Sequence, residues 1–382
     1  MAWQLHYTSA RRGPTGRAGF QFVAQTPGLP DGARAAVTPH LSYRPPPDAP
    51  PAPGDAEIDR FPVALLYDRV GGRPLLLRCR YLGRDYSGRF GNFLGHAVVA
   101  EPDELEGLRP AELWRSPLWA DLPAPDADLP EIEELTPDAA LAPEALAGWL
   151  AASGASGHAM LARLVGAVAG VLGRGHGRVV LVSADGELIA RWIAVVSYSL
   201  PVAVAARLSF LTYSADPDGA AQRLVGTTPD VWAAGRHHAT GAFLVDSLTA
   251  PDGGTPRRFA RTVADCWRDR DFAGLDALGE LALLSASRPG GGPDGGPDGE
   301  GLDLGGLDRA AALLALCRGG APLTTTEEDA VAGLLAGHGA AIPGWVWRDL
   351  VRGAPPAGAA PALRAALGAL IAEARDEPGR GR

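Results

Sequence analysis

Alternating apolar and polar positions characterise the first hundred residues and predict a β-rich region. Four short segments show this period of two, which is typical of strands with one buried face. These segments are residues 19–25, 63–70, 75–82 and 93–100. Gly71 and Gly72 separate the second segment from the third and predict a hairpin.

Beyond residue 142 the pattern changes to helical periods and continuous apolar runs. Pro143 suits the first position of a short helix, and a strand–helix–strand order further on predicts a right-handed βαβ unit. The predicted helices are 143–152, 159–172 and 187–200. The predicted strands are 178–183, 208–214, 222–228 and 241–246.

The last third of the chain shows only helical periodicity, interrupted by one glycine-rich segment. Residues 289–301 carry almost no side chains that could pack and predict a flexible linker. Thr324 with Glu327, or Thr325 with Glu328, fits a capping box at a helix start. The predicted helices are 257–271, 275–285, 308–318, 324–337, 344–351 and 361–375.

These patterns predict an α+β fold in four parts. A β-rich N-terminal domain (1–115) precedes an acidic, proline-rich connector (116–142). An α/β middle domain (143–250) and a helical C-terminal region (251–382) follow. The connector is inferred because residues 116–162 contain eight acidic residues, no basic residue and repeated prolines.

Composition excludes several classes of protein. All 35 basic residues are arginine, so a Walker A loop, a lysine Schiff base and the kinase lysine are impossible. The net charge is −9, although residues 1–100 carry 12 arginines against seven acidic residues. An acidic chain without a basic tract argues against nucleic-acid binding. The basic first hundred residues could face an acidic partner or simply the acidic segment that follows.

The most apolar stretches, 159–172 and 188–211, are each interrupted by arginine, so neither is expected to span a membrane. The first residues lack the apolar core of a signal peptide. A cytoplasmic location is therefore the expectation.

Cysteine and histidine spacing gives no recognisable catalytic or metal motif. Cys79, Cys266 and Cys317 are widely spaced, and the first two are expected to be buried structural residues.

The Asp216–Pro217–Asp218 segment fits a turn better than a metal site. The glycines at 173, 175 and 177 precede a strand, so they predict a helix end rather than a nucleotide loop. No metal or cofactor is expected. The eight histidines are His6, His40, His96, His158, His176, His237, His238 and His338.

The most distinctive segment is the loop before the first predicted strand. Arg11, Arg12 and Arg17 lie there among three glycines. Such a loop can bind an anion or a carboxylate-bearing surface, or it can be an ordinary solvated loop. These three arginines are the candidate partner-binding or anion-binding residues.

Two long stretches resemble a known family. TSARRGPTGRAGFQFVAQTPGLP, from residue 8, is similar to the opening of the bacterial, chiefly actinobacterial, GTPase-associated proteins of the second N-terminal type. VVLVSADGELIARWIAVVSYSLPVAVAARLSFLTYSADP, from residue 179, resembles their middle domain. The resemblance implies a non-catalytic component of an NTP-dependent conflict or signalling system, encoded beside a GTPase. It supplies no catalytic residues.

The first functional hypothesis is therefore a non-enzymatic adaptor or regulator that binds a GTPase or another conflict-system protein. A metal-independent hydrolase is the alternative; it needs His6, His96 and an acid to converge at a cleft between the first two domains. A third hypothesis is an oligomerising scaffold that uses the C-terminal helices. The sequence leaves the oligomeric state open.

Overall fold

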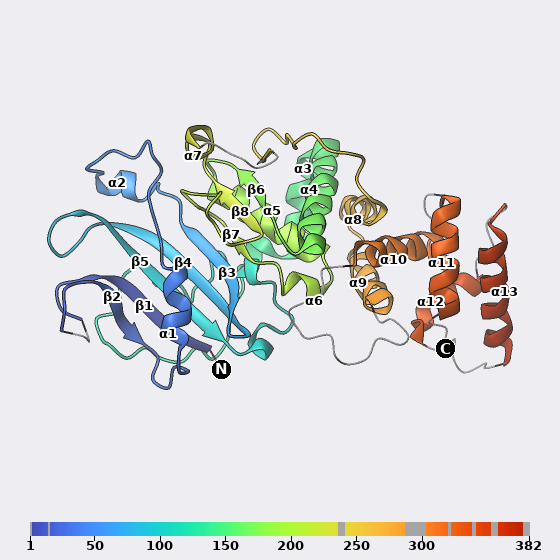
Figure 1. Ribbon diagram of the computed structural model, residues 1–382, viewed down its shortest axis with the longest axis horizontal. Helices are drawn as coiled ribbons and strands as arrows, with labels where there is room; N and C mark the ends of the chain where they lie inside the picture. The colour runs from blue at the N-terminus through green and yellow to red at the C-terminus, as the bar shows by residue number, and fades with distance from the viewer. Residues whose placement is uncertain are drawn as a thin grey trace. The chain divides into compact units, whose positions relative to one another are not determined.

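Contacts within the chain divide the computed structural model in Figure 1 into two units. The structure describes residues 2–13, 16–235, 241–286, 303–319, 322–337, 341–352 and 358–376. Unit 1 comprises 1–152, 176–198 and 203–253, and unit 2 comprises 153–175, 199–202 and 254–382. The strands concentrate in unit 1 and the later helices in unit 2, so the predicted α+β class is confirmed. The boundaries drawn from the sequence stay predictions.

Unit 1 is built on one sheet with the strand order β2-β1-β5-β4-β3-β7-β8-β6-β9. The first five strands in this order pair antiparallel, and the last four run parallel to one another. The strands are β1 (Ala2–Ala10), β2 (Gly19–Gln25), β3 (Ala64–Val70), β4 (Arg73–Arg84), β5 (Phe90–Ala100), β6 (Val179–Val182), β7 (Phe210–Leu211), β8 (Leu224–Thr227) and β9 (Phe243–Leu244).

One antiparallel contact joins the two halves of this sheet. Leu66 of β3 lies opposite Leu211 of β7, and Tyr67 lies opposite Phe210. We call this junction the seam. The predicted β-rich and α/β regions therefore share a continuous sheet.

The hairpin between β3 and β4 forms where the sequence predicted it. Gly71 and Gly72 have φ angles of 56° and 82°, and Val70 pairs with Arg73 across the turn. Both central residues occupy the left-handed region that a type I′ turn requires, which favours glycine.

The strands predicted at 178–183 and 208–214 are parallel, but they are not neighbours. β8 lies between β6 and β7 and pairs with both. A later segment of the chain thus inserts between the ends of the predicted βαβ unit, which local periodicity does not reveal.

Short helices connect the strands of unit 1. Apart from α5, they are ten residues long or shorter, in keeping with their place in loops. They are α1 (Ala33–Val37), α2 (Asp55–Ile58), α3 (Pro143–Ala152), α5 (Gly186–Ser199), α6 (Val202–Ala205), which crosses into unit 2, and α7 (Pro229–Ala234), with 3-10 turns at Thr38–His40, Pro102–Leu105, Pro110–Leu113 and Ala139–Leu141.

Unit 2 is helical. α4 packs against α8, α10 packs against α8 and α9, and α11 packs against α13. The helices are α4 (Gly154–Arg174), α8 (Arg258–Asp269), α9 (Phe272–Ala286), α10 (Leu304–Cys317), α11 (Thr325–Gly337), α12 (Gly344–Arg352) and α13 (Pro361–Asp376). The linker predicted at 289–301 lies outside the described residues.

Two helix ends in unit 2 follow the sequence signals. Gly175, with φ of 71°, terminates α4, as the glycine run predicted. Thr324 and Glu327 form the capping box before α11: the Thr324 N–H donates to the Glu327 carboxylate at 2.8 Å, and the Glu327 N–H donates to the Thr324 hydroxyl at 3.3 Å.

α4 is longer than the 159–172 segment predicted from the sequence. Its 21 residues make it long and apolar enough, by length and composition alone, to cross a membrane. The expectation that this stretch does not span a membrane stays a prediction. Half of its apolar window is buried inside the protein, and a buried core helix passes the same test.

Candidate functional site

The arginine loop is the turn of the β1–β2 hairpin. Arg11, Arg12 and Arg17 are all exposed there. The Gly16 N–H donates to the Gly13 carbonyl at 2.8 Å, and the Arg17 carbonyl accepts from the Gln21 side chain at 2.7 Å. The loop thus presents three guanidinium groups from one end of the sheet, and each can bind a carboxylate or a phosphate in bidentate fashion.

His6 and His96, which the hydrolase hypothesis required to converge, lie directly opposite each other on β1 and β5. Their ring centroids are 4.5 Å apart in an edge-to-face arrangement. Both side chains are buried, at 3 % and 1 % exposure. The structure therefore brings together two residues that are 90 positions apart in the sequence.

Hydrogen bonds show what the histidine pair does. The Nδ1 of His96 accepts from the Ala120 N–H, and the Nδ1 of His6 accepts from the Ala124 N–H, both at 3.0 Å. Because each Nδ1 is an acceptor, each ring carries its proton on Nε2. The His96 Nε2–H donates to the Gln4 side chain at 2.9 Å. The pair thus fastens the segment after residue 119 to the sheet.

Burial lowers the pKa of His6 to about 4. Burial, with added repulsion from His6 and Arg78, lowers the pKa of His96 to about 3. Both rings are therefore neutral at physiological pH and poor proton acceptors. Among the described residues, no carboxylate hydrogen-bonds to either ring, so the geometry is that of a structural clamp.

The rest of the acidic connector also packs on unit 1. Leu129, Leu135 and Trp119 are buried, and the Leu129 N–H donates to the Gln25 carbonyl at 2.9 Å. Ile132 bridges to Ala2 of β1. The connector therefore packs against β1 and β2 as part of the fold of unit 1.

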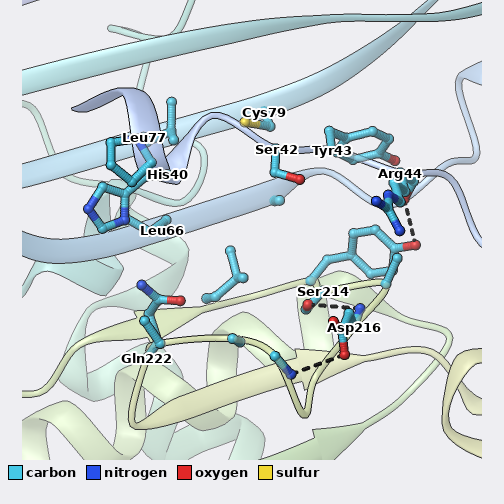
Figure 2. Close-up of a pocket in the computed structure, with 18 residues that line it drawn as sticks. His40, Ser42, Tyr43, Arg44, Leu66, Leu77, Cys79, Ser214, Asp216 and Gln222 are labelled. Atoms are coloured by element: carbon cyan, nitrogen blue, oxygen red, sulfur yellow. Dashed lines mark hydrogen bonds between the residues drawn. The ribbon is translucent and has the colours of Figure 1, made fainter. Parts of the chain in front are cut away.

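A pocket of about 300 Å³ opens at the seam (Figure 2). Residues before β3 and residues after β7 face each other across it. Its apolar lining consists of Ala64, Leu66, Leu77, Cys79 and Leu211, and its polar lining includes His40, Ser42, Arg44, Ser214, Asp216 and Gln222. A cleft between the predicted first two domains therefore exists, but His6 and His96 do not line it.

Two tyrosines form one wall of the seam pocket. Tyr43 and Tyr213 have ring centroids 5.7 Å apart. The Tyr43 hydroxyl donates to the Pro62 carbonyl at 2.6 Å, and the Tyr213 hydroxyl donates to the Arg44 carbonyl at 2.9 Å. Burial raises the pKa of both phenols. Both hydroxyls are thus engaged in holding the pocket together.

Gln222 supplies a hydrogen-bond acceptor on the pocket wall. The residue is only 4 % exposed, and its Nε2 donates to the Asp68 carboxylate at 2.8 Å. That bond fixes the orientation of the amide and leaves its oxygen on the pocket side (Figure 2).

Asp216, which lines the pocket, stabilises a turn and is not arranged as a metal ligand. Its Oδ1 accepts from the Gly219 N–H at 3.0 Å, and its own N–H donates to the Ser214 hydroxyl at 3.1 Å. The Asp216–Asp218 segment is therefore the turn that the sequence predicted. No cluster of metal-binding side chains occurs within the described part of the chain.

The cysteines are thiols of low reactivity. Cys79 and Cys266 are buried, as predicted. Burial raises the pKa of Cys79 to about 12 and that of Cys266 to about 11. Since the thiolate is the nucleophile, the Cys79 thiol in the pocket floor is a weak one at neutral pH.

Unit 2 holds a larger cavity of about 810 Å³ beside α4, α8 and α10. Several arginines line it, but acidic neighbours hold them. Arg258 pairs with Glu327, Arg268 with Asp265, and Arg318 with Asp271. These pairs neutralise the cavity wall and weaken its attraction for an anion.

Sequence reasoning named the arginine loop but not the seam pocket. His40 stood in the sequence only as one of eight histidines, and the His237–His238 pair lies outside the described residues. Gln222 carried no motif at all. Only the β3–β7 pairing, a contact across more than 140 residues, brings these groups together.

Comparison with known proteins finds family matches for the N-terminal and middle regions of the chain. Residues 1–135 match the family model described as GTPase-associated protein 1, N-terminal domain type 2. Residues 146–250 match the model described as GTPase-associated protein 1, middle domain. No curated protein and no solved structure matches the chain significantly.

Proposed function

Because the chain belongs to the GTPase-associated protein 1 family, we propose that it is a non-catalytic adaptor that binds a GTPase in a bacterial conflict or signalling system. The family models together span more than half of the chain and imply a GTPase partner in general. The adaptor role, the cytoplasmic location and the kind of GTPase are our proposal. The family match is the observation that carries it.

The chemistry of unit 1 supports a binding role. Its paired histidines are neutral and hold backbone amides, and the thiol in its pocket has a raised pKa. In its arginine loop, in contrast, the side chains of Arg11 and Arg12 are exposed. We propose that Arg11, Arg12 and Arg17 contact acidic groups of the partner.

One of these arginines can also act on the partner's reaction. A guanidinium placed against the developing charge on a transferred phosphoryl group accelerates GTP hydrolysis in trans. Such an effect would show as a higher turnover of GTP by the partner and would not require a nucleophile in this chain.

The test uses the GTPase that the resemblance places beside the gene. The purified chain is expected to capture that GTPase, and GTP turnover is measured with and without the chain. If the intact chain does not capture the GTPase, the adaptor proposal is contradicted.

The seam pocket keeps the hydrolase as a second candidate. It combines an apolar floor with the side chains of His40, Ser42 and Asp216. Turnover of a small molecule by the purified chain, abolished by His40→Ala or Cys79→Ala, would establish it and contradict the adaptor proposal.

A further inference from the structure

The two edges of the sheet differ in how they end. At one edge, β9 is two residues long, and Leu244 pairs with Thr249 of the same chain. At the other edge, β2 is seven residues long. Gln25 of β2 has main-chain partners on its outer side: it donates to the Ala127 carbonyl and accepts from the Leu129 N–H. Among the described residues, the main-chain groups of Phe20, Phe22 and Val23 have no hydrogen-bond partner apart from β1, so this part of the edge is open to another strand.

An exposed aromatic side chain stands on this open edge. Phe20 is 44 % exposed, although its ring lies 5.8 Å from Tyr7 and 5.1 Å from Phe93. These neighbours restrict the ring and still leave much of the side chain exposed. A large apolar side chain that is already held in place loses little freedom when a partner covers it.

The open edge carries opposite charges at its two ends. The loop with Arg11, Arg12 and Arg17 adjoins Gly19, and the exposed side chains of Asp126 and Asp128 adjoin Gln25. Within the described part of the chain, no ion pair engages Arg11, Arg12, Asp126 or Asp128. A seven-residue strand is roughly 20 Å long, about two and a half times the screening length in physiological salt. The two ends therefore cannot neutralise each other within one copy.

We propose that a second copy of this chain covers the edge, with the two β2 strands antiparallel about a two-fold axis. An antiparallel pairing places the arginine loop of each copy against Asp126 and Asp128 of its partner. One rotation thus satisfies both charged ends, the open main-chain groups and Phe20, as a self-complementary interface requires. An acidic strand from a different partner would fit less well, because Asp126 and Asp128 would repel it at the Gln25 end of β2.

This pairing has a consequence for the adaptor. The arginines that the dimer engages are those proposed to contact the GTPase, so self-association and GTPase binding would compete. The competition rests on the proposed function, whereas the pairing itself does not.

The test is sedimentation velocity of the full chain at low salt, about 0.05 M, where charge contacts are least screened. Wild type is expected to dimerise. Arg11/Arg12/Arg17→Glu and Asp126/Asp128→Arg are each expected to weaken the dimer by about tenfold or more, because each places like charges together at both ends. Arg60/Arg69/Arg163→Glu changes the same number of exposed arginines off this edge and should leave the dimer intact.

A mixture of the two charge-reversal variants tests the proposed β2–β2 pairing most directly. Each variant alone repels its own copies, but together they restore both contacts, so a one-to-one heterodimer is expected. Circular dichroism establishes that each variant is folded. A wild-type chain that stays monomeric, or a mixture that stays monomeric while wild type dimerises, would overturn the pairing. Neither outcome involves the GTPase, so failure here is distinct from failure of the adaptor proposal.

Discussion

The histidine clamp and the seam pocket are two polar places in unit 1, and they differ in almost every physical respect. At the clamp, His6 and His96 are buried, and each binds a main-chain amide. At the seam pocket, His40 is half-exposed beside open space. The clamp histidines have lowered pKa values and do not line the seam pocket, which has a volume of about 300 Å³.

This contrast shows why a shifted pKa is not by itself a sign of catalysis. The pKa values of the clamp histidines are lowered by burial, which is also what a structural role produces. Space for a substrate and a suitable proton acceptor must coincide, and His6 and His96 do not line the seam pocket. The following three experiments test that separation.

The largest effect is expected at the clamp. His96→Ala leaves the Ala120 N–H and the Gln4 side chain without their partner and opens a cavity in a packed layer. We expect the free energy of unfolding to fall by about 2–4 kcal/mol, measured by urea denaturation. Unchanged stability would show that the clamp does not hold the connector.

A second effect is expected from pH. The unfolded histidines titrate near their ordinary value of 6.5, whereas the folded His6 has a pKa of about 4. Below pH 6.5 the unfolded state therefore binds more protons, so stability is greatest above that value and declines as the pH falls toward 4. Urea midpoints across this range measure the decline.

His6→Asn sharpens the pH experiment, because asparagine offers an acceptor to the Ala124 N–H but does not titrate. The decline should be shallower in this variant than in wild type. An identical pH profile would mean that carboxylates elsewhere cause the acid sensitivity.

The smallest effect is expected at the pocket. The His40 ring makes no hydrogen bond within the described residues, and the side chain is half-exposed. His40→Ala should therefore change stability by no more than about 0.5 kcal/mol, measured under the same conditions as His96→Ala. A loss comparable to that of His96→Ala would erase the contrast between the two places.

Local signals predicted the elements that local physics determines. β2 (19–25) and α3 (143–152) have the bounds expected from alternation and from Pro143. β1 was missed although Trp3, Leu5 and Tyr7 alternate there with the polar residues Gln4, His6 and Thr8. The structure buries these polar residues as well. The cover on one face comes from residues beyond 119, and nothing near β1 in the sequence announces it.

The site was predictable only where one segment contains it. Arg11, Arg12 and Arg17 share a loop, so composition alone singled them out, and their role stays a prediction. The seam pocket joins residues near 40 to residues near 220. The pairing of His6 with His96 likewise depends on the β1–β5 register. Such long-range contacts require the fold.

Calorimetric titration of the neighbouring GTPase into the chain tests the adaptor account most directly. The account predicts binding by wild type, an affinity at least about tenfold lower for Arg11/Arg12/Arg17→Ala, and unchanged affinity for His40→Ala. Wild-type affinity in the triple variant, combined with loss of binding in His40→Ala, would contradict it and move the functional surface to the seam pocket.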